Sequence, residues 1–266
     1  MRRARIGVLL GGYVFLYLPI AVVVLFSFNM SPVPGMWTGF STHWYHALWN
    51  NHDLIAAVLT SAHIAAWAAT GATLLGTLAA LALVRVKVFP GKALMRTFIA
   101  APLMVPEVMT GLSLLLMFVS LERFVGWPSE RGVMTVVFAH ITLAMGYVFL
   151  IVKARLQNLD HSLEEAALDL GAKPFQVLWR VTLPLIAPSL VAGWLLSFSL
   201  SLDDVVVASF VSGPGSTTLP MLIFSSLRVG ATPEINALAT VLVAIMSISV
   251  AFVGWLVWRR SPAHAR

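Results

Sequence analysis

Residues 54–84 read LIAAVLTSAHIAAWAATGATLLGTLAALALV and contain no Asp, Glu, Lys or Arg. An α-helix needs about 20 apolar residues to cross about 30 Å of hydrocarbon, so this stretch is long enough to span a bilayer. Glycine and alanine recur along it, and small residues let neighbouring helices approach closely. The stretch therefore predicts a transmembrane helix at the centre of a helical bundle.

Five further stretches have the same apolar character. The chain of 266 residues is 59% hydrophobic and 11% charged, which leaves too few polar side chains to cover a soluble surface. Among the six stretches only one contains an acid, Glu107. We predict an all-α integral membrane protein with six transmembrane helices in a single domain over residues 1–266. The other five predicted spans are residues 6–28, 97–121, 132–152, 187–202 with its continuation, and 236–258.

The basic residues indicate how the chain is oriented. Lys and Arg near the ends of spans are retained on the cytoplasmic side. Of the 17 Lys and Arg residues, only Arg123, Arg131 and Arg228 fall on the opposite side. We therefore predict a protein of the bacterial inner membrane with both termini in the cytoplasm and periplasmic loops at residues 29–53 and 210–235. Because the net charge of +6 gathers at the edges of apolar blocks, it indicates a membrane surface rather than nucleic acid as the partner.

Two further features narrow the class of protein. The first apolar stretch is longer than the core of a signal peptide and no small-x-small cleavage site follows it, so we expect a retained anchor helix. The chain contains no cysteine, which excludes disulfides and thiolate zinc sites.

The predicted loop at residues 29–53 is rich in aromatic residues, which favour the headgroup layer of a membrane. We expect an interfacial helix there. His43 and His46 have the i, i+3 spacing of a metal pair, but polar tips on an amphipathic segment explain them better, because Asp53 is the only carboxylate nearby. His63 and His140 lie inside predicted spans, where interhelical hydrogen bonds are the favoured role.

The predicted cytoplasmic loop at residues 153–186 is strongly patterned. Ser162 followed by Glu165 predicts a capping box that starts a short helix. Gly171 can end this helix in the left-handed conformation, and Pro174 can occupy the first turn of a second one. Ala166 and its neighbour Ala167 make one face of the first helix flat, which suggests that another backbone docks there.

This loop resembles the EAA loop of ABC-importer permeases, whose pattern is Glu-Ala-Ala, then Gly, then Ile-x-Leu-Pro. The one departure is Val181 in place of Ile. The resemblance implies a type I ABC importer permease fold in which this loop is a coupling helix that docks on the ATPase subunit. The residues implied to couple the two subunits are Glu165, Ala166, Ala167, Gly171, Leu183 and Pro184.

The same resemblance implies the partners of the chain. They are an ABC ATPase dimer, a second homologous permease and a periplasmic substrate-binding protein, all in a lipid bilayer and without nucleic acid. The chain has no Gly-x-x-x-x-Gly-Lys-Ser/Thr motif, so we expect it to carry no cofactor of its own and ATP with Mg to be bound by the ATPase partner. The chain itself is then a transporter subunit and not an enzyme.

The resemblance extends to a branch of the family. Residues 199–215, 218–220 and 233–240 are similar to permeases of the polyamine-import branch, which implies putrescine or spermidine as the substrate. An importer of another small solute is the alternative. A secondary cation transporter is less favoured because matching halves with broken helices are not seen. A membrane enzyme is less favoured because no constellation of His, Asp and Glu gathers at one depth.

Three acids are the predicted lining of the substrate path. On a continuous helix from Arg96, Glu107 would lie about 16 Å deep, close to the bilayer midplane. Asp203 and Asp204 are successive, so they cannot face the same way, and one can line the path while the other caps or pairs. The alternatives are a protonated Glu107 bonded to a carbonyl freed by a proline, and solvation of the Asp pair at a helix end.

Overall fold

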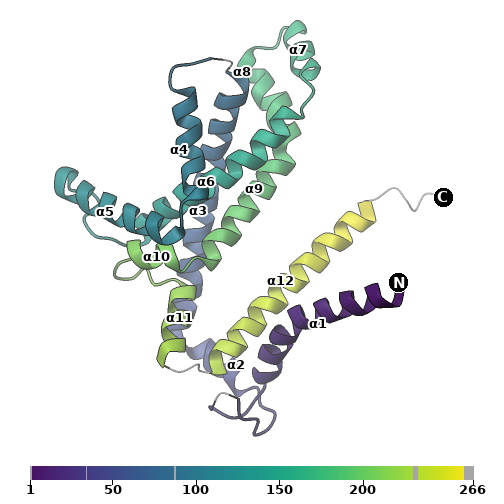
Figure 1. The fold of residues 1–266 in the computed structure, drawn as a ribbon, viewed down its shortest axis with the longest axis vertical. Coiled ribbons are helices and arrows are strands. Elements are labelled where there is room, and N and C mark those ends of the chain that lie inside the picture. The colour runs from purple at the N-terminus through teal and green to yellow at the C-terminus, as the bar shows by residue number, and fades with distance from the viewer. Residues whose placement is uncertain (1, 34, 87, 230–232, 261–266) are drawn as a thin grey trace. The chain divides into compact units, whose positions relative to one another are not determined.

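The structure is a computed structural model that describes residues 2–33, 35–86, 88–229 and 233–260 (Figure 1). Every element in these ranges is a helix, apart from one isolated bridge between Asn29 and Phe40. The chain divides into two compact units, Met1–Ile55 with Ile223–Arg266, and Ala56–Leu222.

The first unit is built from the two ends of the chain. Helix α12 (Pro233–Arg260) packs against α1 (Arg2–Phe26) and α2 (His43–Asn50), and Figure 1 shows α1 and α12 side by side. The Asn51 amide donates to the Glu234 carboxylate at 2.9 Å, which ties the end of α2 to the start of α12. A helix therefore forms inside the 29–53 loop as predicted, while its place at a membrane interface stays a prediction.

The second unit is a bundle in which α3 (His52–Arg85), α4 (Lys92–Met104), α6 (Val133–Gln157) and α9 (Leu183–Asp203) run alongside one another (Figure 1). A Cβ on Gly76 would lie 2.8 Å from the Cβ of Val148, so the glycine lets α3 approach α6 closely. The predicted central place of residues 54–84 is confirmed by fully buried alanines along α3. These are Ala65, Ala68, Ala69, Ala72 and Ala80.

A short helix fills one end of this bundle. Helix α10 (Val206–Val211) packs between α5 (Glu107–Val125) and α6, and its Val207 and Val211 are fully buried. They join Phe118 of α5 and Val136 of α6 in one apolar cluster. Residues that follow α9 in the sequence are thus folded back beside the start of α5.

The predicted span 97–121 is not one helix, which corrects our expectation. Helix α4 ends at Met104, Val105 is extended with φ −90° and ψ 136°, and α5 begins at Glu107. The cause is Pro106, since a proline disfavours the helical conformation of the residue before it and has no amide hydrogen. Figure 1 shows α5 turning away from the direction of α4, so the continuous helix assumed in predicting the depth of Glu107 does not form.

The all-helical membrane fold is confirmed. Five helical stretches of the described residues are long and apolar enough to cross a membrane: Leu9–Phe26, His52–Arg85, Glu107–Val125, Val133–Gln157 and Pro174–Asp203. The sixth predicted span falls in α12, which has 28 residues. Side chains such as Phe15, exposed to 79%, have the character of a lipid-facing surface.

Candidate functional site

Helix α7 (Ser162–Asp169) forms where the sequence predicts it, but its start differs from the prediction. The residue before the first turn is His161, and no side chain makes a capping hydrogen bond, so the capping box of Ser162 and Glu165 is wrong. Ser162 lies one residue too late for that role. The Asp160 carboxylate instead accepts the Ser162 amide hydrogen at 2.9 Å. This bond and one to the Ser162 side chain lower the pKa of Asp160.

The end of α7 follows the prediction closely. Gly171 has φ +86°, its amide donates to the Leu168 carbonyl at 2.9 Å, and the Ala172 amide donates to the Ala167 carbonyl at 3.1 Å. This pair of bonds is a Schellman motif, which satisfies carbonyls at a helix end. Pro174 then occupies the first turn of α8 (Pro174–Val177), also as predicted.

The second short helix does not stand alone, which corrects our expectation of a separate pair of helices. Helix α8 passes through a π-helical turn, η1 (Leu178–Thr182), directly into α9. The Leu183 amide donates to the Leu178 carbonyl, five residues back. Pro184 explains the wide turn, because its ring would clash with the carbonyl of Arg180 in an ordinary α-helix. The part of the loop from Pro174 onward is therefore helically continuous with a predicted membrane span.

The residues implied to couple to an ATPase fall into two groups, one on the exposed helix α7 and one packed in the bundle. Glu165 and Ala166 are exposed on α7, Ala167 is half-buried, and α7 has no buried residue. Leu183 packs against the apolar cluster of the bundle. Around α7 lies an exposed apolar surface, which we call the tip surface. It consists of Leu163, Leu168, Leu170, Phe175 and Trp179.

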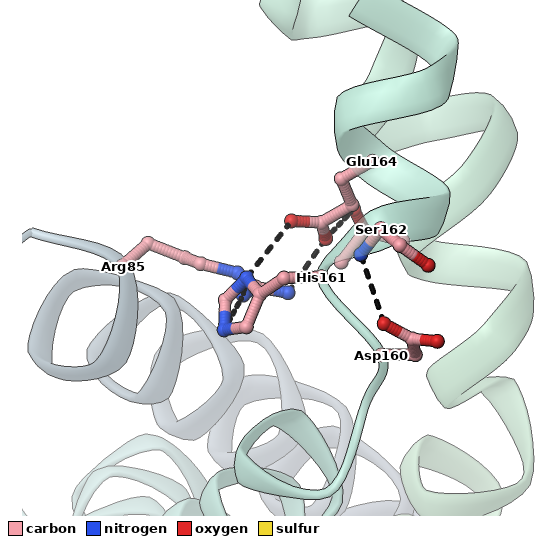
Figure 2. A network of polar contacts seen from close by, with 6 residues as sticks. Arg85, Asp160, His161, Ser162 and Glu164 are labelled. Carbon is pink, nitrogen blue, oxygen red and sulfur yellow. Dashed lines mark hydrogen bonds and ion pairs between the residues drawn. The ribbon is translucent and has the colours of Figure 1, made fainter.

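Glu164, rather than Glu165, fastens α7 to the bundle (Figure 2). Its Oε1 accepts from Arg85 Nη2 at 2.6 Å and from the Thr182 hydroxyl at 2.7 Å. Arg85 Nη1 lies 2.8 Å from Nδ1 of His161, at the start of α7. The sequence did not single out these residues, because nothing in it shows that the end of α3 lies beside the start of α7.

The three acids predicted to line the substrate path meet at one cavity of about 500 Å³ in the second unit. It lies where α4 ends and α5 begins, beside α6 and the end of α9. Tyr147 and the prolines Pro102 and Pro106 also line it. The structure thus brings together side chains that are about 100 positions apart in the sequence, and the lining acids are Glu107, Asp203 and Asp204.

Asp204 is the acid that is fully engaged. Its carboxylate accepts the amide hydrogens of Val207 at 3.2 Å and Ala208 at 2.7 Å, at the start of α10. Its Oδ2 also lies 3.1 Å from Nε2 of His140, whose Nδ1 lies 2.6 Å from the Ser201 hydroxyl. His140 is buried, so its expected interhelical hydrogen bonds are confirmed. Asp204 therefore caps α10 and pairs with His140.

Glu107 and Asp203 are held differently. In the described part of the chain neither carboxylate makes a hydrogen bond to another residue's side chain, and Glu107 is exposed. The alternative in which Glu107 bonds to a carbonyl freed by a proline is not seen. Among the described residues no group of three His, Asp or Glu side chains is arranged to hold a metal ion. The free carboxylates can instead accept hydrogen bonds from a cation in the cavity.

Known proteins resemble the chain over almost its whole length. Residues 72–259 match the family described as binding-protein-dependent transport system inner membrane component. The chain is 51% identical over 257 residues to the putrescine transport system permease protein PotI of Escherichia coli (strain K12), covering 97% of the chain and 91% of that protein. It is 41% identical over 249 residues to the spermidine/putrescine transport system permease protein PotC of the same strain, covering 94% and 92%.

The fold also matches solved structures. A chain of a bacterial ABC transporter involved in the import of the acidic polysaccharide alginate superposes with a TM-score of 0.70 at 16% identity, covering 98% of both chains. An inward-facing methionine ABC transporter gives a TM-score of 0.58 at 17% identity, covering 77% of this chain and 94% of the other. These similarities support the architecture of the bundle.

Proposed function

Because the chain belongs to the family of binding-protein-dependent transport system inner membrane components, and so is the permease subunit of an ABC importer, we propose that it carries a small polyamine into the cell. Putrescine or spermidine is the proposed cargo. The observation that supports this cargo is the cavity at which Glu107 and Asp203 present free carboxylates.

Charge is the physical reason for this choice of cargo. An ammonium group that leaves water loses several kcal/mol of solvation unless charged acceptors replace the water. The free carboxylates of Glu107 and Asp203, which both line the cavity, supply such acceptors for a cation and repel an anion. Asp204 has both oxygens engaged, so its role is to hold α10 and the cavity wall in place.

The proposal for energy coupling uses the tip surface. Exposed Leu170, at 90%, and Phe175, at 69%, form apolar area that a partner could cover, beside exposed Glu165 and Ala166. We assign this face to an ATPase dimer that binds ATP and Mg. The tip surface and both termini then lie in the cytoplasm, and the 29–53 and 210–235 loops lie in the periplasm.

Two further partners complete the proposed complex. A second, homologous permease would supply the other half of the transport path, and a periplasmic binding protein would deliver the polyamine. Exposed apolar side chains along α3, such as Trp67 at 60% and Leu74 at 62%, leave area for lipid or for the second permease.

Uptake of labelled putrescine in cells that lack other polyamine importers tests the proposed cargo. Replacing Asp203 with Asn keeps the shape and removes the charge, so we expect uptake to fall about tenfold or more, as for the loss of an interaction worth about 1.4 kcal/mol. Glu122→Gln is the matched control, since Glu122 is an exposed acid of α5 that does not line the cavity. Wild-type uptake by Asp203→Asn and Glu107→Gln would rule out a cation path built on these acids.

A further inference from the structure

We propose that Arg85 and Glu164 form the joint through which α7 moves α3, and that they are positioning residues for coupled transport. This inference rests on the proposed docking of an ATPase at the tip surface. It adds residues outside the loop pattern that the sequence resembles, since neither Arg85 nor Glu164 belongs to the Glu165-Ala166-Ala167 motif.

Helix α7 is only loosely packed by apolar side chains. Helix α7 has no buried residue, and it packs against α8 and η1, which follow it directly in the chain. Apolar burial is what normally fixes a helix to a bundle. No side chain of α7 is fully buried, so its polar contacts contribute strongly to fixing its position.

The polar contacts converge on one carboxylate oxygen. Glu164 Oε1 accepts from Arg85 at 2.6 Å and from Thr182 at 2.7 Å, as Figure 2 shows for the arginine. The side chains of Arg85 and Glu164 are only 21% and 16% exposed, so the ion pair is largely shielded from solvent. Thr182 is buried. A partly buried pair of this kind holds its geometry better than a surface pair.

The positions of the partners give the joint its function. Arg85 is the last residue of α3, and Thr182 is the last residue of the π-helical turn that leads into α9. One side chain of α7 is therefore bonded to residues of two helical stretches that are long and apolar enough to cross a membrane. Because Glu165 is exposed while Glu164 faces inward, a push on α7 from outside passes through Glu164 to the ends of α3 and α9.

His161 supports the same joint from the other side. Its ring nitrogens lie 2.8 and 3.1 Å from Arg85 Nη1, and its Nδ1 lies 4.0 Å from Glu164 Oε2. Figure 2 shows the imidazole beside the guanidinium, with Asp160 directed toward Ser162 instead. Asp160 therefore binds the Ser162 amide at the start of α7 and takes no part in the joint.

Reconstituted transporter tests the proposal through the amount of cargo moved per ATP hydrolysed. We expect Glu164→Gln and Arg85→Gln to lower this ratio by about 5- to 150-fold, the usual range of coupling between sites, while the ATPase still copurifies with the permease. Exchanging the charges, Arg85→Glu with Glu164→Arg, should restore a substantial part of the ratio. Asp169→Asn on α7 and Arg96→Gln on α4, both exposed, are controls expected to keep the wild-type ratio.

Three results would overturn the joint. The first is a wild-type amount of cargo moved per ATP hydrolysed in both single variants. The second is loss of the ATPase from Glu164→Gln during purification, which would make Glu164 a docking residue. The third is a charge-exchange variant that moves no more cargo per ATP than either single variant.

A second measurement does not depend on the ATPase. The chain has no cysteine, so spin labels on Asp169→Cys in α7 and Leu78→Cys in α3 need no background substitutions. In the full-length chain in nanodiscs, Glu164→Gln should broaden the distance distribution between the labels, whereas Glu165→Gln should leave it unchanged. Equal widths would contradict the joint. If the proposed function itself is wrong, the wild-type permease will bind no ATPase, and this result is distinct from any change in the label distances.

Discussion

The cavity and the tip surface differ in how their acids are held. In the cavity, Asp204 is fixed by two backbone amides and a buried histidine, while Asp203 beside it is left free. At the tip, Glu164 is fixed by Arg85 and Thr182, while Glu165 beside it is exposed. In each pair one acid holds the structure and its neighbour is available to a partner, so identical residue types in adjacent positions take different roles.

The largest effect is expected at Gly171, which ends α7. Its φ of +86° suits glycine, and a β-branched side chain there costs about 1–3 kcal/mol of strain. We expect Gly171→Val to abolish ATPase copurification and uptake while the protein still inserts. A Cβ at this position would meet no atom within 4 Å, so strain and not crowding is the cause.

Asparagine separates these two causes, because it tolerates the left-handed conformation better than other side chains. Gly171→Asn should retain most ATPase copurification. Equal losses in the Val and Asn variants would mean that bulk, rather than backbone conformation, matters at the end of α7.

The next effect contrasts the two cavity acids. Asp204→Ala removes a buried acceptor and leaves two amide hydrogens and His140 without it, which costs about 1–3 kcal/mol for an unsatisfied group. We expect a lower midpoint of thermal unfolding in detergent. Asp203→Asn should leave that midpoint unchanged and lower only uptake. If both variants unfold at the same temperature as the wild-type protein, Asp204 does not stabilise the fold and the proposed difference between the two acids is wrong.

The sequence anticipates features that follow from local chemistry. Gly171 ends α7, Pro174 starts α8 and the alanines of residues 54–84 are buried, because turn conformation and small size are properties of single residues. Proline chemistry predicts a bend at Pro106, but a hydropathy window does not show that one helix ends and another begins there. The pairing of Arg85 with Glu164 was missed, since it depends on tertiary packing that no local pattern encodes.

The predicted capping box of Ser162 and Glu165 was wrong for a local reason. The residue before the first turn is His161, so Ser162 is already part of the helix and cannot be its cap, and the Asp160 carboxylate accepts the Ser162 amide hydrogen instead. The Ser162 amide is one of the donors of the first turn that no carbonyl within the helix can accept, so the Asp160 carboxylate satisfies it.

The smallest effect is expected at Asp160. Its folded-state pKa is lowered by the hydrogen bonds from Ser162, so its contribution to α7 is present above the ordinary pKa of an aspartate and is lost as the pH falls through the folded value. Asp160→Ala should speed hydrogen exchange of the first-turn amides of α7 at neutral pH. The difference from wild type should shrink in acid. A difference that is independent of pH would show that the charge of Asp160 does not stabilise this turn.

Uptake of labelled putrescine into proteoliposomes is the most direct test of the account as a whole. The liposomes hold the permease with its partner permease and ATPase, and the binding protein is added on the side opposite the ATPase. The account predicts uptake that requires ATP on the ATPase side, persists when an ionophore removes the ion gradients, and falls in Asp203→Asn. Uptake that proceeds without ATP and stops with the ionophore would contradict it and would identify a secondary cation transporter instead.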